Sequence, residues 1–197
     1  RIAEAGKEWS RGNLLAVNAH GDVFTVSDEK LVQVDFNGGP LRVMASDLKK
    51  PSALACDRAG NFYVFDSAKE RKNIRVYDPS GKFLREIGEA GGYQRGPWNQ
   101  QRMDHVTALA VDARNQVWAV DWNYWPKRIS LWSAEGKFQK EFLGPTEYGG
   151  AGQLDPGDKR RLFYGPLEFE LDWASGKSRL KNLLSLDGHG ASDSPIY

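Results

Sequence analysis

The sequence predicts an all-β fold made of repeated four-stranded antiparallel sheets, and three observations lead to that prediction. Aromatic side chains, which favour strands, make up 12% of the 197 residues, whereas Met occurs only twice. The 21 Gly and 9 Pro residues divide the chain into short apolar runs, and no helical period persists beyond about two turns. The third observation is an internal repeat.

The repeat emerges when the sequence is shifted by 55 residues against itself, so that Asp57 falls on Asp112 and Asp66 on Asp121. Over residues 53–86 the two copies agree at 11 of 34 positions without a gap. A fainter copy precedes them and a degenerate copy follows. The copies predict units at about 13–45, 51–88 and 106–143, a partial fourth unit at about 161–187, and a tail at 188–197.

Each unit predicts four short strands, named a to d, that are separated by turns. In the second unit we expect strand a at 52–56, b at 62–66, c at 74–77 and d at 83–87. Gly60 in the a–b turn and Gly81 in the c–d turn supply a positive φ. In the third unit Asn115 stands in place of Gly60, and Asn also tolerates the left-handed region.

Strand b is apolar on both faces, as residues 62–65 (FYVF) and 117–120 (VWAV) show. A sheet with one solvated face alternates apolar and polar residues, whereas a sheet stacked between two neighbours must be apolar on both faces. Four-stranded units repeated at roughly 40–55 residues are typical of propeller blades. We therefore predict a β-propeller in which each unit is a blade.

Residues 51–66 (PSALACDRAGNFYVFD), followed by 73–78 (NIRVYD), resemble an NHL repeat. That family has the approximate pattern P-x-G-I-A-V-D-x-x-G-N-I-Y-V-A-D, then R-I-Q-V-F-D. Residues 106–132 resemble it too, with Val106 in place of the Pro. The resemblance implies a propeller of the NHL type, a family that typically closes with about six blades. The chain holds about three and a half to four blades. They either form an open arc of a larger ring, which would leave Trp118 near an uncovered face, or close as a four-bladed ring. We favour the arc.

The length differences between units all fall at one end of the blades. In an up-and-down blade the b–c and d–a connections lie at the opposite end from the a–b and c–d turns. The a–b and c–d turns are short, whereas the d–a connections cover 45–50, 88–105 and 144–160. Binding residues often lie on variable loops of a rigid scaffold. We expect any site on this loop face; the alternative is that the long loops only cover the rim.

The candidate binding residues lie on the loop face. One b–c loop concentrates aromatic and cationic side chains, which stack on sugars or cations and anchor protein interfaces; its members are Trp122, Tyr124, Trp125, Lys127 and Arg128. The alternative is that Trp122 or Trp125 folds back over the blade. The d–a connections add Asp104, His105 and Tyr148.

The resemblance also raises an enzymatic alternative, because some NHL-like propellers are lyases with a metal held in the channel by His from several blades. The position before strand a offers Asn13, Lys50 and His105, a poor set of metal ligands. We therefore predict no catalytic residue, no metal and no cofactor, and a channel Ca²⁺ or Zn²⁺ only under the alternative. That alternative is a fragment of a metal-dependent lactonase resembling gluconolactonases, or of an NHL-type lyase, whose site needs blades absent here.

Composition narrows the class of partner. The 27 basic and 26 acidic residues nearly balance, which gives no electrostatic case for nucleic acid, and no run reaches the roughly 18 apolar residues of a membrane span. The single cysteine, Cys56, excludes an internal disulfide. The chain starts at Arg1, so we expect an excerpt of a longer chain; the compartment is not predicted, with an extracytoplasmic location slightly favoured. The leading hypothesis is a non-enzymatic scaffold that binds a protein or glycan partner.

Overall fold

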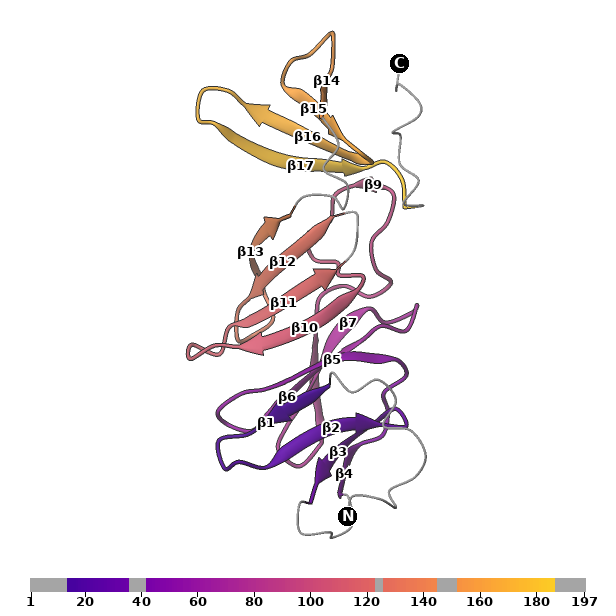
Figure 1. The fold of residues 1–197 in the computed structure, drawn as a ribbon, viewed down its shortest axis with the longest axis vertical. Coiled ribbons are helices and arrows are strands. Elements are labelled where there is room, and N and C mark those ends of the chain that lie inside the picture. Colours follow the sequence, from indigo (N-terminus) through magenta and orange to yellow (C-terminus); the bar gives the residue numbers. More distant parts are fainter. Residues whose placement is uncertain (1–13, 36–41, 123–125, 145–151, 187–197) are drawn as a thin grey trace.

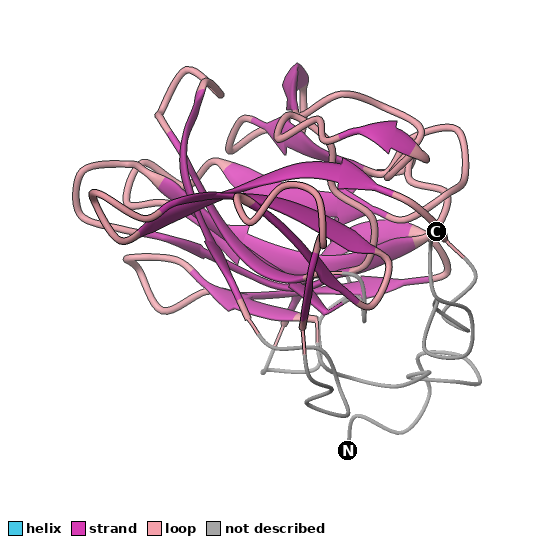
Figure 2. Cartoon of the chain, turned by 90° about the horizontal axis from the view of Figure 1, so that it is seen from above, coloured by secondary structure: helices cyan, strands magenta, loops and turns pink. Residues whose placement is uncertain are grey.

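The computed structural model describes residues 14–35, 42–122, 126–144 and 152–186. The described residues form four antiparallel sheets and no helix (Figures 1 and 2). This confirms the all-β prediction. The first three sheets follow the chain order of a simple meander, so each is a blade with its strands in the order a, b, c, d.

The first three sheets contain four strands each. Blade 1 contains β1 (Leu15–Val17), β2 (Val23–Ser27), β3 (Lys30–Val34) and β4 (Arg42–Ala45). Blade 2 contains β5 (Pro51–Cys56), β6 (Phe62–Asp66), β7 (Asn73–Tyr77) and β8 (Phe83–Ile87). Blade 3 contains β10 (Val106–Val111), β11 (Val117–Trp122), β12 (Lys127–Trp132) and β13 (Phe138–Leu143).

The a–b turns of blades 2 and 3 share one hydrogen-bond pattern. Asp57 accepts a bond from the amide of Asn61, and Asp112 accepts one from the amide of Gln116. The left-handed position is occupied by Gly60 at φ 86° and by Asn115 at φ 59°. The expectation that Asn could replace Gly at this turn is therefore confirmed.

Neighbouring blades pack face to face through apolar side chains, which is the arrangement expected for blades that are apolar on both faces. The core between blades 2 and 3 joins residues such as Tyr63, Phe65 and Ile74 to Val117 and Trp132, which are each 0–2% exposed. A second core joins blade 1 to the opposite face of blade 2. Blade 2 is thus buried on both faces, which explains why its strand b shows no polar alternation.

The fourth sheet departs from this plan. It contains β14 (Gln153–Leu154), β15 (Arg161–Tyr164), β16 (Leu167–Asp172), β17 (Lys177–Leu183) and, beyond β17, β9 (Gly96–Pro97). Strand β9 belongs to the d–a connection between blades 2 and 3, so this loop extends the fourth sheet. A small core around Tyr93, Leu167 and Leu183 joins the sheet to that connection.

The sheets are arranged as an open arc. Blade 1 lies at one end of the molecule and the fourth sheet at the other (Figure 1), so the described residues do not close into a four-bladed ring. Trp118 lies half-buried on the face of blade 3 that points away from blade 2. The arc that the sequence favoured, with Trp118 near an uncovered face, is the observed arrangement.

Candidate functional site

The loop face is organised by one buried aspartate in each of blades 2 and 3. Asp66 ends β6 and accepts hydrogen bonds of 2.9 Å from the backbone amides of Lys49 and Lys50. Asp121, its repeat equivalent, accepts bonds of 2.8 Å from the amides of Asp104 and His105. Each carboxylate therefore fixes the end of the d–a connection just before strand a begins.

The two carboxylates differ in their remaining partners. Arg71 pairs with Asp66 at 2.5 Å, whereas Asp121 accepts a 2.7 Å bond from the hydroxyl of Tyr93. Burial alone would raise the pKa of Asp66, but the amide bonds and Arg71 outweigh it and lower that pKa. Burial prevails at Asp121 and raises its pKa, because the donors that face it are neutral.

Asp104 and His105 lie where the sequence placed them, before strand a of blade 3. Asp104 forms an ion pair with Lys72 of blade 2, so its carboxylate joins two blades. The backbone of His105 is held by Asp121 and by the amide of Trp122, while its side chain is exposed. Of the two, His105 is the residue that presents its side chain to solvent.

Arg128 is internal. It is 2% exposed, its guanidinium pairs with Glu141 at 2.7 Å, and it donates 2.6 Å bonds to the carbonyls of Arg102 and Gln100. The same cation lies 5.4 Å from the ring centre of Trp98. These contacts hold the long 88–105 connection against blade 3, so Arg128 positions the loop face from inside.

Trp122 and Lys127 form the exposed part of this site. The Trp122 side chain is 54% exposed, and the ammonium of Lys127 lies 4.9 Å from its ring centre. The two residues are paired across β11 and β12. Trp122 does not fold back under the blade, so an indole with one cationic neighbour faces solvent at the b–c end. Tyr124, Trp125 and Tyr148 lie outside the described residues.

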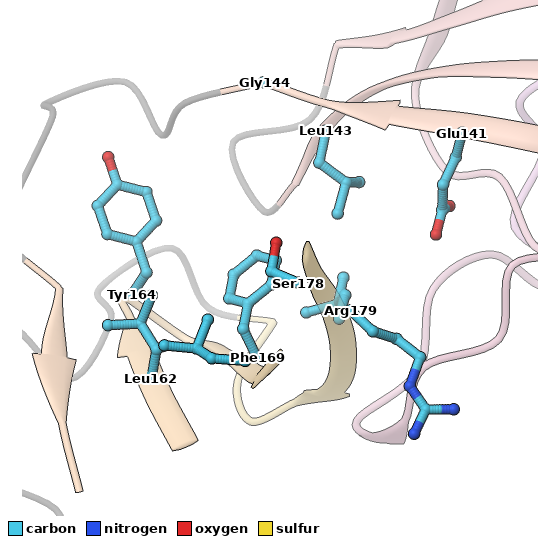
Figure 3. A pocket seen from close by; sticks show the side chains of 10 residues that line it. Glu141, Leu143, Gly144, Leu162, Tyr164, Phe169, Ser178 and Arg179 are labelled. Atoms are coloured by element: carbon cyan, nitrogen blue, oxygen red, sulfur yellow. The ribbon is translucent and has the colours of Figure 1, made fainter. Parts of the chain in front are cut away.

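A cleft of about 640 Å³ lies between blade 3 and the fourth sheet (Figure 3). Leu143 faces Leu162, Tyr164 and Phe169 across it, and Arg179 lies at its rim with the guanidinium turned outward. Arg179 pairs there with Glu170. The lining is mainly apolar, which is consistent with two sheets that splay apart.

Among the described residues, no group of three or more His, Cys, Asp and Glu side chains is placed to hold a metal ion. The same residues include no helix of the length and apolarity needed to cross a membrane.

Two residues that organise the site were not anticipated. Tyr93, which donates to Asp121, and Trp98, whose indole donates a 3.0 Å bond to Glu141, both lie in the 88–105 connection. The sequence of that connection is not repeated in the other d–a connections, at 45–50 and 144–160, so the repeat gave no signal for either residue. The only available signal was composition, since two large aromatics in a Gly-rich loop indicate that the loop packs onto something.

No family model matches the sequence, and no curated protein matches it. Solved structures are similar in fold. A chain in the crystal structure of a nidogen/laminin complex aligns with a TM-score of 0.52 and 16% identity over 86% of this chain and 74% of that chain. A chain of Kuenenia stuttgartiensis hydrazine synthase gives 0.52 and 14% over 90% of this chain and 53% of that chain. At such identities the likeness shows the fold alone, and together with the sheet order it makes the chain an arc of a β-propeller.

Proposed function

We propose that this chain is a binding scaffold of the NHL type, and that it recognises a protein or glycan partner on the loop face. The observation that carries the proposal is the solvent-facing Trp122 with Lys127 beside its ring. An indole that offers an open face can stack on a sugar ring or on a partner side chain, and aromatics with neighbouring cations are frequent interface anchors.

The motif positions also support the NHL assignment. The first motif aspartate (Asp57 or Asp112) closes the a–b turn, and the last (Asp66 or Asp121) fixes the start of strand a. Both are therefore structural in this chain, and each explains why the repeat requires a carboxylate at that point.

A scaffold role also accounts for the carboxylates at this face. Asp66 and Asp121 are saturated by backbone amides, and Asp104 is paired with Lys72 between two blades. Groups engaged in this way stabilise the loops, and an acid or base would have to break those contacts to work on a substrate.

The test compares Trp122→Ala with Trp173→Ala, a control that removes an indole 65% exposed in the turn between β16 and β17. Labelled chains are applied to a glycan array and, in parallel, used for quantitative affinity capture from extract. We expect Trp122→Ala to lose binding by about tenfold or more, since central aromatic anchors contribute about 2 kcal/mol or more, and Trp173→Ala to bind normally. Equal binding by all three chains would contradict the proposal.

The enzymatic alternative keeps one supporting observation, the exposed side chain of His105 at the start of the inner strand β10. Elemental analysis of the purified chain, with and without His105→Ala, tests it. A stoichiometric metal that is lost in the variant would favour the enzyme; no change would favour the scaffold.

A further inference from the structure

A row of three residues crosses the loop end of blade 3. The backbone amide of Trp122 donates a 2.9 Å bond to the carbonyl of His105, and Trp122 is paired with Lys127 on the next strand. Residues that lie opposite each other on neighbouring strands present their side chains side by side. The side chains of His105 and Trp122 are exposed, and Lys127 is half-buried. In this row Trp122 therefore stands between an imidazole and an ammonium group.

Blade 2 has the same row, and there the last cation of the row binds a carboxylate. The repeat shift of 55 residues places Lys72 at the position of Lys127 and Ser67 at that of Trp122. Lys72 pairs with Asp104, which lies in the connection that leads into blade 3. Their side chains are 24% and 20% exposed, so the ion pair is largely withdrawn from water. A lysine at this position thus binds a carboxylate of the polypeptide that packs against its blade.

Lys127 has no such carboxylate. Among the residues that the structure describes, no acidic side chain pairs with Lys127, whose ammonium lies 4.9 Å from the ring centre of Trp122. The row lies on the outer face of blade 3, the face that points away from blade 2. The described strand residues of blade 3 that share this face include Lys127 and Lys140 and no acidic side chain. An acidic partner would complement this charge.

The apolar part of the outer face extends beyond Trp122. Strand alternation places Ile129 and Phe142 on the same face, and their side chains are 40% and 45% exposed. The corresponding residues of blade 2, Ile74 and Ile87, are 0% exposed because they pack on blade 3. The exposed apolar surface is therefore wider than one indole, and it suits the apolar side chains of a protein better than a single sugar ring.

The polar contacts of blade 2 also favour a protein as the partner. Ser52 and Arg85 of blade 2 donate hydrogen bonds to main-chain carbonyls of blade 3. The repeat shift places Thr107 and Lys140 at these two positions in blade 3. Blade 3 thus keeps a hydroxyl and a cation where blade 2 binds carbonyl oxygens, and a polypeptide supplies such oxygens along its whole length.

We propose that the partner of this site is an acidic segment of a protein, whose carboxylate binds Lys127 while a neighbouring apolar side chain packs on Trp122 and Ile129. This inference rests on the binding role proposed above and narrows the partner from a protein or glycan to one chemistry. Lys127 then binds the partner as Lys72 binds Asp104. The indole beside the ion pair excludes water, and a charge pair withdrawn from water contributes more to binding than an exposed pair.

The test begins with a displayed library of random short peptides, selected on the immobilised chain after depletion on the Trp122→Ala chain. We expect the selected peptides to be enriched in Asp or Glu close to an aromatic or aliphatic residue. One selected peptide is then synthesised with its acid and with the corresponding amide. Both forms are titrated against the unaltered chain, Lys127→Gln, Lys127→Arg and Lys137→Gln. Lys137 is the matched control, because it is an exposed lysine in the turn between β12 and β13, at the opposite end of blade 3.

We expect the acidic peptide to bind the unaltered chain about tenfold more tightly than its amide, and Lys127→Arg and Lys137→Gln to keep this preference. In Lys127→Gln the preference should fall to about twofold or less, because the variant has no charge to pair with the acid. Circular dichroism and melting temperature confirm that each variant is folded.

The other outcomes separate this inference from the proposed function. Selected peptides without a preference for the acid, or a preference that Lys127→Gln retains, would overturn the inference and leave the binding role of Trp122 standing. Binding of uronic acid glycans on an array, with no peptide selected, would also overturn it and would identify a glycan partner. A chain that binds neither peptides nor glycans would contradict the proposed function itself.

Discussion

The equivalent aspartates Asp66 and Asp121 should respond to pH in opposite directions, although both sit at the end of strand b. In the folded chain the pKa of Asp66 is lowered and that of Asp121 is raised. A lowered pKa contributes stability that is present above the unfolded pKa of about 3.9 and is lost as the pH falls through the folded value. A raised pKa contributes stability that is present below about 3.9 and is lost as the pH rises through the folded value.

The perturbation is Asp66→Asn and, separately, Asp121→Asn, which keep the shape but remove the titration. Asp66 accepts three amide bonds and one bond from Arg71, and Asp121 accepts two amide bonds and one bond from Tyr93. Asn at either position leaves at least one of these donors unsatisfied. A stranded buried donor costs about 1–3 kcal/mol. We therefore expect each variant to lose a few kcal/mol of unfolding free energy at neutral pH, with the pH dependence superimposed.

Urea unfolding followed by tryptophan fluorescence between pH 3 and pH 7 measures both effects. The difference in unfolding free energy between unaltered chain and Asp66→Asn should grow as the pH rises. The corresponding difference for Asp121→Asn should shrink. Parallel slopes for the two variants would refute the assignment of Arg71 and Tyr93 as the partners that separate the two sites.

Three further outcomes are expected. Gly81→Ala should be strongly destabilising, because a Cβ there would collide with the backbone carbonyl of Met44 in blade 1, whereas Gly21→Ala, with a similar positive φ and open space, should cost only about 1–2 kcal/mol; chemical unfolding of both variants compares them. Burial raises the pKa of Cys56 to about 11, so its alkylation at pH 8 should be on the order of 100-fold slower in the folded chain than in urea, and equal rates would contradict its placement. Arg128→Met should free the 88–105 connection and increase its amide exchange without unfolding the blades, as measured by mass spectrometry; unchanged exchange would show that Arg128 does not hold the loop.

The repeat made the blades predictable. Identities such as Asp57 with Asp112 mark turns that fold the same way, and the apolar runs on both faces follow from stacking between neighbours. Asn115 shows why a local physical argument succeeded, since the turn requires a backbone conformation rather than a particular residue. The exposed outer face of blade 3, near Trp118, could also be predicted, because an open arc leaves the outer faces of its end blades uncovered.

The loop face was less predictable. The docking of the fourth sheet through β9 depends on the 88–105 connection, and the sequence of this connection is not repeated in the other units, so no second copy helps to interpret it. Arg128 was expected to meet a partner because Arg in an aromatic loop often does, but strand alternation turns it inward while Trp122 and Lys127 turn outward. The direction of a side chain at a loop end depends on the strand register, which the sequence alone did not settle.

The central claim is that one blade face is built twice, buried in blade 2 at Tyr63 and Phe65 and exposed in blade 3 at Ile129 and Phe142. Hydroxyl-radical footprinting of the unaltered chain tests it directly, because the extent of labelling reports how exposed each side chain is. The account predicts strong labelling of Trp118, Trp122 and Phe142, with Tyr63 and Phe65 protected. Equal protection of both sets, or labelling of Tyr63 as fast as Phe142, would contradict it.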